Sequence, residues 1–97
     1  MRIAICDDLK TERQKAIDAL QTVIKNFSIT EFDDGNELLK SHALLPYDLI
    51  ILDILMPKIN GIDMAAILRK TDTKTPVIFM STSEEFRAIA SLLLIIF

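Results

Sequence analysis

Short apolar runs alternate with amphipathic stretches along this chain, and the alternation restricts the fold more than any other feature. The runs are short and rich in β-branched residues, which is typical of strands: Arg2–Cys6, Phe27–Phe32, Tyr47–Asp53 and Thr75–Ser81. The stretches between them repeat apolar residues at helical spacing. Strands that alternate with helices form a parallel sheet covered by helices on both faces. We therefore expect an α/β doubly wound parallel sheet with the strand order 2-1-3-4-5.

Polar residues mark where the predicted helices begin. Thr11 and Gln14 have the spacing of a capping box, in which two polar side chains bind free backbone groups at the start of a helix. Asp34 with Glu37 indicates a second helix start. Asn60 precedes the third amphipathic stretch and predicts the start of a third helix.

Composition narrows the class of protein. A chain of 97 residues suffices for one core, so we expect residues 1–97 to form a single domain. The net charge of −3 argues against a nucleic-acid partner, and no apolar run approaches the ~20 residues that span a bilayer. The single cysteine, Cys6, excludes an internal disulfide and is expected in the core of a cytoplasmic domain. His42 has no potential metal ligand at a suitable spacing, so we expect it at the surface.

The segment Ser91–Phe97 fits two structures. Its apolar residues suit either a fifth buried strand or the end of a fourth helix, and the β-branched residues favour the strand. In a strand, alternate side chains of Leu92–Phe97 face opposite sides of the sheet, and no further helix follows to cover one of those sides. Because large apolar side chains are costly to leave in water, we expect a homodimer that buries them.

Three acidic residues stand where predicted strands end. Asp7 and Asp8 follow the first strand, and Asp53 closes the third. Parallel strands that lie side by side bring their carboxyl ends to one edge of the sheet, where doubly wound folds bind their ligands. Clustered carboxylates repel one another, and a hard divalent cation such as Mg²⁺ relieves the repulsion. The pattern predicts Mg²⁺-assisted phosphoryl chemistry, although each acid by itself could equally cap a helix or lie in solvent.

The hydroxyl of Ser81 completes this predicted site. Ser81 ends the fourth apolar run, so its side chain is expected at the same edge, where it could bind a phosphoryl oxygen. Thr82 is the second choice, because it has the capping-box spacing with Glu85 that indicates a helix start.

These motifs together resemble the receiver domain of two-component response regulators. The resemblance rests on Asp7-Asp8, on the run DLIILDILMPKINGID and on TPVIFMS, and it extends from residue 1 to about residue 90. The opening RIAICDD and the later SEEF look most like receivers that precede LytTR-type DNA-binding domains. The resemblance implies a flavodoxin-like sheet and a signalling domain that phosphorylates itself and is not a conventional enzyme.

The resemblance also assigns roles to individual residues. Asp53 is the implied phosphoacceptor, which receives a phosphoryl group from a sensor histidine kinase or a small phosphodonor. Asp8 is the implied direct ligand of Mg²⁺, Asp7 binds the ion mostly through water, and Leu55 contributes its backbone carbonyl. Ser81 matches the switch hydroxyl of the family. The implied output is regulation of transcription.

The sequence departs from this pattern in its last stretch. Receivers carry a lysine after the fifth strand and then a fifth helix, whereas no lysine follows Lys74 here, so we expect a receiver that is incomplete at its C-terminus. One alternative is therefore an interaction module that works without phosphorylation. Another is a small phosphatase with an aspartyl nucleophile, although such enzymes show D-x-D where this chain has Asp7-Asp8.

Overall fold

The computed structural model describes residues 1–80, which form four strands and three helices. In chain order these are β1 (Arg2–Cys6), α1 (Lys10–Val23), β2 (Ser28–Phe32), α2 (Gly35–Leu44), β3 (Leu49–Asp53), α3 (Gly61–Leu68) and β4 (Val77–Met80). Residues 81–97 lie outside the described part, so the predictions for Ser81, for the Leu92–Phe97 segment and for the homodimer remain predictions.

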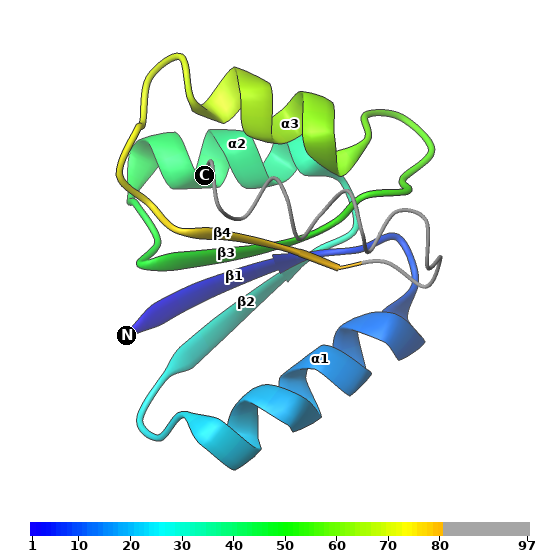
Figure 1. The fold of residues 1–97 in the computed structure, drawn as a ribbon, viewed down its shortest axis with the longest axis vertical. Coiled ribbons are helices and arrows are strands. Elements are labelled where there is room, and N and C mark those ends of the chain that lie inside the picture. The colour runs from blue at the N-terminus through cyan, green and yellow to red at the C-terminus, as the bar shows by residue number, and fades with distance from the viewer. Residues whose placement is uncertain (81–97) are drawn as a thin grey trace.

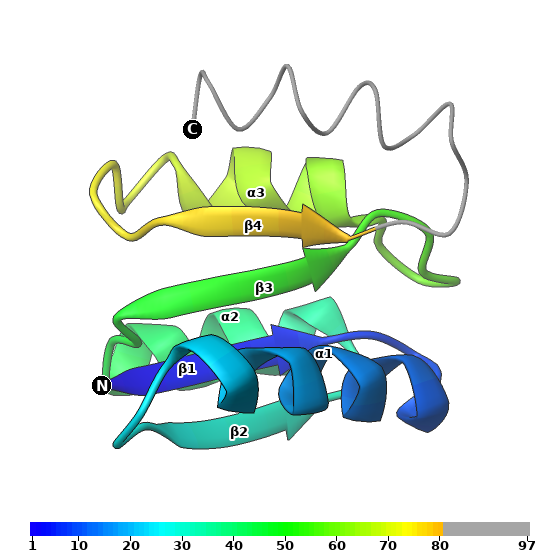
Figure 2. The same ribbon diagram turned by 60° about the horizontal axis from the view of Figure 1, so that its bottom comes forward.

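The four strands form one parallel sheet in the order β2-β1-β3-β4 (Figure 2). Strand β1 pairs with β2 along one side and with β3 along the other. Ile3 of β1 lies opposite Ile29 of β2 and opposite Leu49 of β3. This is the predicted order 2-1-3-4-5 for the strands that the structure describes. Since all strands run the same way, the end of β1 at Cys6 and the end of β3 at Asp53 meet at one edge of the sheet.

Helices cover both faces of the sheet, as the alternation predicted. Figure 1 shows α1 on one face and α2 with α3 on the other. Strand β1 is buried on both sides: Ile3 and Ile5 pack on the α1 side, while Ala4 and Cys6 belong to the larger core under α2 and α3. Strands buried on both faces are uniformly apolar, which is why the first and third runs show no polar alternation. None of the helices described here is long and apolar enough to cross a membrane.

Three of the predicted helix starts lie within residues 1–80, and two of these are confirmed. The Asp34 carboxylate accepts the Asn36 N–H at 2.9 Å, and the Asn60 amide oxygen accepts the Asp63 N–H at 2.8 Å. The capping box at Thr11 is wrong, because α1 begins at Lys10 and its N-cap is Leu9, which makes no side-chain capping bond. The turn before α1 is instead held by residues of the acidic edge, described below.

His42 is the clearest correction to the sequence analysis, since it is buried and only 5% exposed. Its Nδ1 accepts the Tyr47 N–H at 3.0 Å, and its Nε2 lies 2.7 Å from Oδ2 of Asp72. The ring also stacks on Tyr47. Hydrogen bonds from Thr75 and His42 hold the pKa of Asp72 below its usual range. His42 therefore ties the end of α2 to the connection between α3 and β4.

We expect His42→Ala to lower the free energy of unfolding by roughly 2–4 kcal/mol. The substitution leaves a cavity and removes the partner of a buried backbone N–H. Lys40→Ala is the control on the same helix, because Lys40 is exposed and forms only a surface ion pair with Glu37, at 3.6 Å. Urea unfolding of the two variants measures the difference, and equal losses in both would contradict the role assigned to His42.

Candidate functional site

The three predicted acids do come together at the carboxyl edge of the sheet. Asp7 and Asp8 follow β1 directly, and Asp53 is the last residue of β3. One carboxylate oxygen from each lies within 4.8 Å of the others. Asp7 is buried, Asp53 is partly buried and Asp8 is exposed, so the cluster opens to solvent on the Asp8 side. The parallel pairing of β1 with β3 produces this arrangement.

Backbone hydrogen bonds fix the turn that carries Asp7 and Asp8. The Asp7 N–H donates to the carbonyl of Phe32 at 3.0 Å, which extends the pairing of β1 with β2 past its last residue. One Asp7 carboxylate oxygen accepts the Leu9 N–H at 2.9 Å. This bond closes the turn at the start of α1, which explains why the helix begins before Thr11.

Asp53 is held by the close approach of α3 to the end of β3. The Gly61 N–H donates to the carbonyl of Ile54 at 3.0 Å, so the first residue of α3 lies against the backbone of the strand end. A Cβ on Gly61 would lie 2.2 Å from the Asp53 carbonyl oxygen. Asn60-Gly61 was predicted only as a helix start, and this role of Gly61 was not predicted. The glycine next to the capping asparagine was the available signal.

Burial and mutual repulsion disturb the titration of the cluster. Burial, followed by the charge of Asp7, raises the pKa of Asp53 to about 6, against weaker opposition from backbone N–H groups. Burial also raises the pKa of Asp7, and the neighbouring Asp8 adds to the effect. Ionising all three carboxyl groups at this edge of the sheet therefore costs free energy.

The metal-free protein is expected to lose stability as the pH rises from 4 to 7. Because the pKa of Asp53 is raised from 3.8 to about 6 on folding, its stabilising contribution is fully present below pH 4 and is lost as the pH passes 6. A change of this size corresponds to at most about 3 kcal/mol, and solvent screening of the partly exposed carboxylate lowers that amount. Asp53→Asn should remove most of this pH dependence, as measured by urea unfolding in EDTA at pH 4, 5, 6 and 7. If Asp53→Asn loses as much stability between pH 4 and pH 7 as the parent, Asp53 is not the source of the pH dependence.

The donor atoms of the cluster suit a hard divalent cation. Carboxylate oxygens are the ligands that Mg²⁺ prefers, and a cation would offset the repulsion that raises the two pKa values. Leu55 lies two residues past Asp53, in the loop after β3, and its N–H donates to Oδ1 of Asp53 at 3.4 Å. Ser81 lies outside the described residues, so its place at this edge remains a prediction.

Cys6 takes no part in this chemistry. The side chain is fully buried, as predicted, and burial raises the pKa of its thiol to about 12. Its Sγ lies 3.5 Å from Sδ of Met56 in the loop after β3. A thiol that is neutral at every physiological pH acts as a small core residue.

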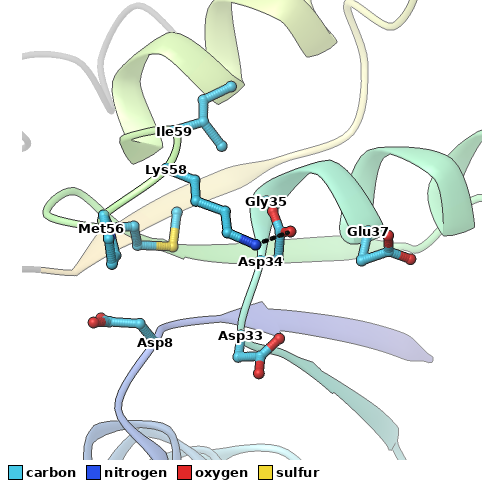
Figure 3. A pocket seen from close by; sticks show the side chains of 9 residues that line it. Asp8, Asp33, Asp34, Gly35, Glu37, Met56, Lys58 and Ile59 are labelled. Carbon is cyan, nitrogen blue, oxygen red and sulfur yellow. Dashed lines mark ion pairs between the residues drawn. The ribbon is translucent and has the colours of Figure 1, made fainter.

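A cavity of about 280 Å³ adjoins the cluster and shares Asp8 with it (Figure 3). It lies between the β2–α2 connection and the loop after β3. The lining residues are Asp8, Asp33, Asp34, Gly35, Glu37, Met56, Pro57, Lys58 and Ile59. Figure 3 shows Lys58 crossing this space toward Asp34, with Nζ 3.6 Å from the carboxylate. Asp34 was predicted only as a helix cap, and Asp33 and Lys58 were not predicted as residues near the site.

Fold and site together define a class of protein. A parallel sheet of order 2-1-3-4, with three carboxylates clustered where β1 and β3 end, defines a doubly wound α/β domain with an acidic site that suits a divalent cation. The chain belongs to the response regulator receiver domain family, whose family model matches residues 3–94. The receiver domain is a module of two-component signalling and is not a conventional enzyme.

Individual relatives agree with this assignment. The chain is 34% identical over 65 residues to the uncharacterized transcriptional regulatory protein YkoG of Bacillus subtilis, covering 67% of this chain and 28% of that protein. It is 32% identical over 73 residues to the response regulator ArlR of Staphylococcus epidermidis, covering 75% of this chain and 33% of that protein. The chain thus spans about a third or less of the length of these relatives.

Solved structures give the same fold. The response regulator TrrA of Thermotoga maritima, in complex with Mg²⁺ and BeF, matches with a TM-score of 0.80 and 31% identity. That match covers 96% of this chain and 79% of TrrA. A two-component transcriptional regulator AraC from Clostridium phytofermentans matches with a TM-score of 0.76 and 28% identity, over 91% of this chain and 72% of the other.

Proposed function

We propose that this receiver domain accepts a phosphoryl group on Asp53 from a sensor histidine kinase, with Mg²⁺ bound at Asp7, Asp8 and Asp53. The observation that carries the proposal is the approach of the three carboxylates within 4.8 Å at the end of β3. The relationship to TrrA, whose structure holds Mg²⁺ and BeF, supports the choice of metal and of phosphoryl chemistry.

Asp53 is the nucleophile in this proposal. One carboxylate oxygen attacks the phosphorus of a phosphohistidine, the new O–P bond forms as the P–N bond breaks, and the histidine departs with a proton from solvent. The product is an acyl phosphate on the protein. With a pKa of about 6, Asp53 is mostly ionised near neutral pH and can attack, while its partial burial keeps bulk water away.

The other acids hold the cation. Asp8 is the proposed direct ligand and Asp7 the ligand that binds mostly through water, as the resemblance to receivers implies. In the cluster Asp8 is the exposed member and Asp7 is buried. The backbone carbonyl of Leu55 is the proposed further ligand. When bound, Mg²⁺ supplies positive charge that stabilises the phosphoryl oxygens as negative charge develops on them.

We further propose that phosphorylation switches a surface that controls transcription. Ser81 is the proposed switch hydroxyl, which binds the new phosphoryl oxygens. YkoG is named as a transcriptional regulatory protein, which supports this output. The resemblance of RIAICDD and SEEF to receivers of the LytTR type supports a DNA-binding output region of that kind. A cytoplasmic histidine kinase domain is the corresponding upstream partner.

Phosphorylation is tested directly by intact mass. The purified chain is incubated with acetyl phosphate and Mg²⁺, and the proposal expects one added phosphoryl group, which EDTA prevents. A chain that stays unmodified with acetyl phosphate and with phosphorylated histidine kinases would instead be an interaction module that works without phosphorylation.

Mg²⁺ is expected to stabilise the folded protein, and Asp8→Ala to abolish that effect. At ten times its Kd, Mg²⁺ adds about 1.4 kcal/mol to the free energy of unfolding. The metal-free variant should be as stable as the parent or slightly more so, because one member of the repelling cluster is gone. Asp33→Ala is the matched control, since Asp33 lies beside Asp8 in the cavity but outside the cluster. Thermal melts with and without Mg²⁺ measure both, and an unchanged Mg²⁺ response in Asp8→Ala would exclude Asp8 as a ligand.

A further inference from the structure

Arg13 of α1 holds the acidic turn from outside the cluster. Its Nη1 donates to the backbone carbonyl of Asp7 at 2.7 Å, and its Nε donates to Oε1 of Glu31 at 3.0 Å. The side chain is only 14% exposed, against 39% for Glu31. The guanidinium therefore joins three elements: the first turns of α1, the end of β1 and the end of β2.

We propose that Arg13 is a positioning residue, which sets the backbone of Asp7 and thereby the spacing of the Asp7 and Asp8 carboxylates for a divalent cation. This inference rests on the function proposed above. The cluster of acids is the site, and Arg13 acts on it through the backbone that carries two of its members.

The hydrogen bonds around Asp7 explain why this single contact matters. The Asp7 N–H is bound to Phe32 and the Asp7 carboxylate to the N–H of Leu9. The carbonyl of Asp7 accepts a hydrogen bond from Nη1 of Arg13. With all three groups bound, the peptide between Asp7 and Asp8 has a fixed orientation. Without Arg13 this peptide is free to rotate, and the direction of the Asp8 side chain changes with it.

A planar guanidinium is required for this arrangement. Its fork reaches a backbone carbonyl and a carboxylate at the same time, whereas the single nitrogen of lysine lies at the end of a flexible stem and lacks the fork geometry. Arg13→Lys consequently keeps the positive charge but loses the fixed geometry. Arg13→Gln loses both.

Positioning and plain electrostatics predict opposite results for these variants. A positive charge near a cation site repels the cation, so removing it should tighten Mg²⁺ binding if charge were the whole effect. In that case Arg13→Lys would bind like the parent and Arg13→Gln would bind more tightly. If Arg13 positions the turn, both variants bind Mg²⁺ more weakly.

Calorimetric titration of the whole chain with Mg²⁺, at a temperature well below the melting point of each metal-free variant, decides between these outcomes. We expect the Kd to rise about tenfold in Arg13→Lys and in Arg13→Gln, the usual effect of removing a group that orients metal ligands. Lys15→Gln is the matched control, because it removes a positive charge from the same helix where Lys15 pairs only with Glu12. Its Kd should stay within about twofold of the parent.

Three results would overturn the inference while leaving the proposed function intact. The first is an unchanged Kd in Arg13→Lys, and the second is tighter binding in Arg13→Gln. A lower melting temperature of the metal-free variants with an unchanged Kd would show a structural role alone and would also overturn it. If Arg13→Gln does not fold, the Kd of Arg13→Lys for Mg²⁺ alone decides whether Arg13 positions the turn. A parent protein that does not bind Mg²⁺ contradicts the proposed function, and the inference fails with it.

Discussion

Asp53→Asn is expected to abolish phosphorylation by acetyl phosphate and Mg²⁺, with no phosphoryl group detectable by intact mass. The asparagine amide has nearly the shape of the carboxylate, but its oxygen is neutral and a poor nucleophile, so no acyl phosphate forms. The fold should be retained, because relief of the repulsion with Asp7 stabilises the metal-free variant. Loss of the modification therefore cannot be attributed to unfolding.

Asp48→Asn is the matched control for this experiment. Asp48 precedes β3, whereas Asp53 ends it, so the two residues lie at opposite edges of the sheet. The Asp48 carboxylate accepts the Arg2 N–H at 2.7 Å. The variant keeps an acceptor for that bond and should be phosphorylated like the parent. Full modification of Asp53→Asn would place the phosphoacceptor elsewhere and would contradict the proposed mechanism.

Apolar patterning and strand-end residues were sufficient to predict the fold and the acidic cluster. A strand buried on both faces must be apolar throughout, so Arg2–Cys6 and the run before Asp53 could be recognised from the sequence. Once the strands are parallel and β1 pairs with β3, the positions of Asp7, Asp8 and Asp53 follow from topology alone. No side-chain detail is needed for that step.

Two features that the sequence did not predict, the burial of His42 and the contact of Arg13, depend on partners distant in the chain. His42 is buried because Asp72, 30 residues away, binds its ring, and nothing local indicates this partner. The contact of Arg13 with Glu31 joins residues 18 apart and forms only when α1 packs beside β2. These two interactions require the assembled fold. The failure of Thr11 as a helix start has a local cause instead, because the Asp7 carboxylate accepts the N–H of Leu9, two residues further along the chain.

Gly61→Ala is expected to have the largest effect on stability, with a loss of about 3 kcal/mol or more. The added Cβ would lie 2.2 Å from the Asp53 carbonyl oxygen and 3.1 Å from the Cα of Ile54. Both are backbone atoms, one of them in β3, so neither can move aside as a side-chain end would. The backbone of Gly61 has no positive φ, so the need for glycine comes from space and not from conformation. Urea unfolding measures the loss.

Gly35→Ala separates this steric effect from the general cost of replacing a buried glycine. Gly35 also opens a helix and is also buried, but its added Cβ would meet the side chain of Met64, 2.6 Å from Sδ. A methionine end moves at low cost, so we expect a loss of about 1 kcal/mol. Gly61→Ala should also slow phosphorylation of Asp53 beyond its effect on stability, since α3 can only relieve the clash by displacing the strand end that carries the nucleophile. Equal stability losses in the two variants, with normal phosphorylation in both, would show that α3 does not set the position of Asp53.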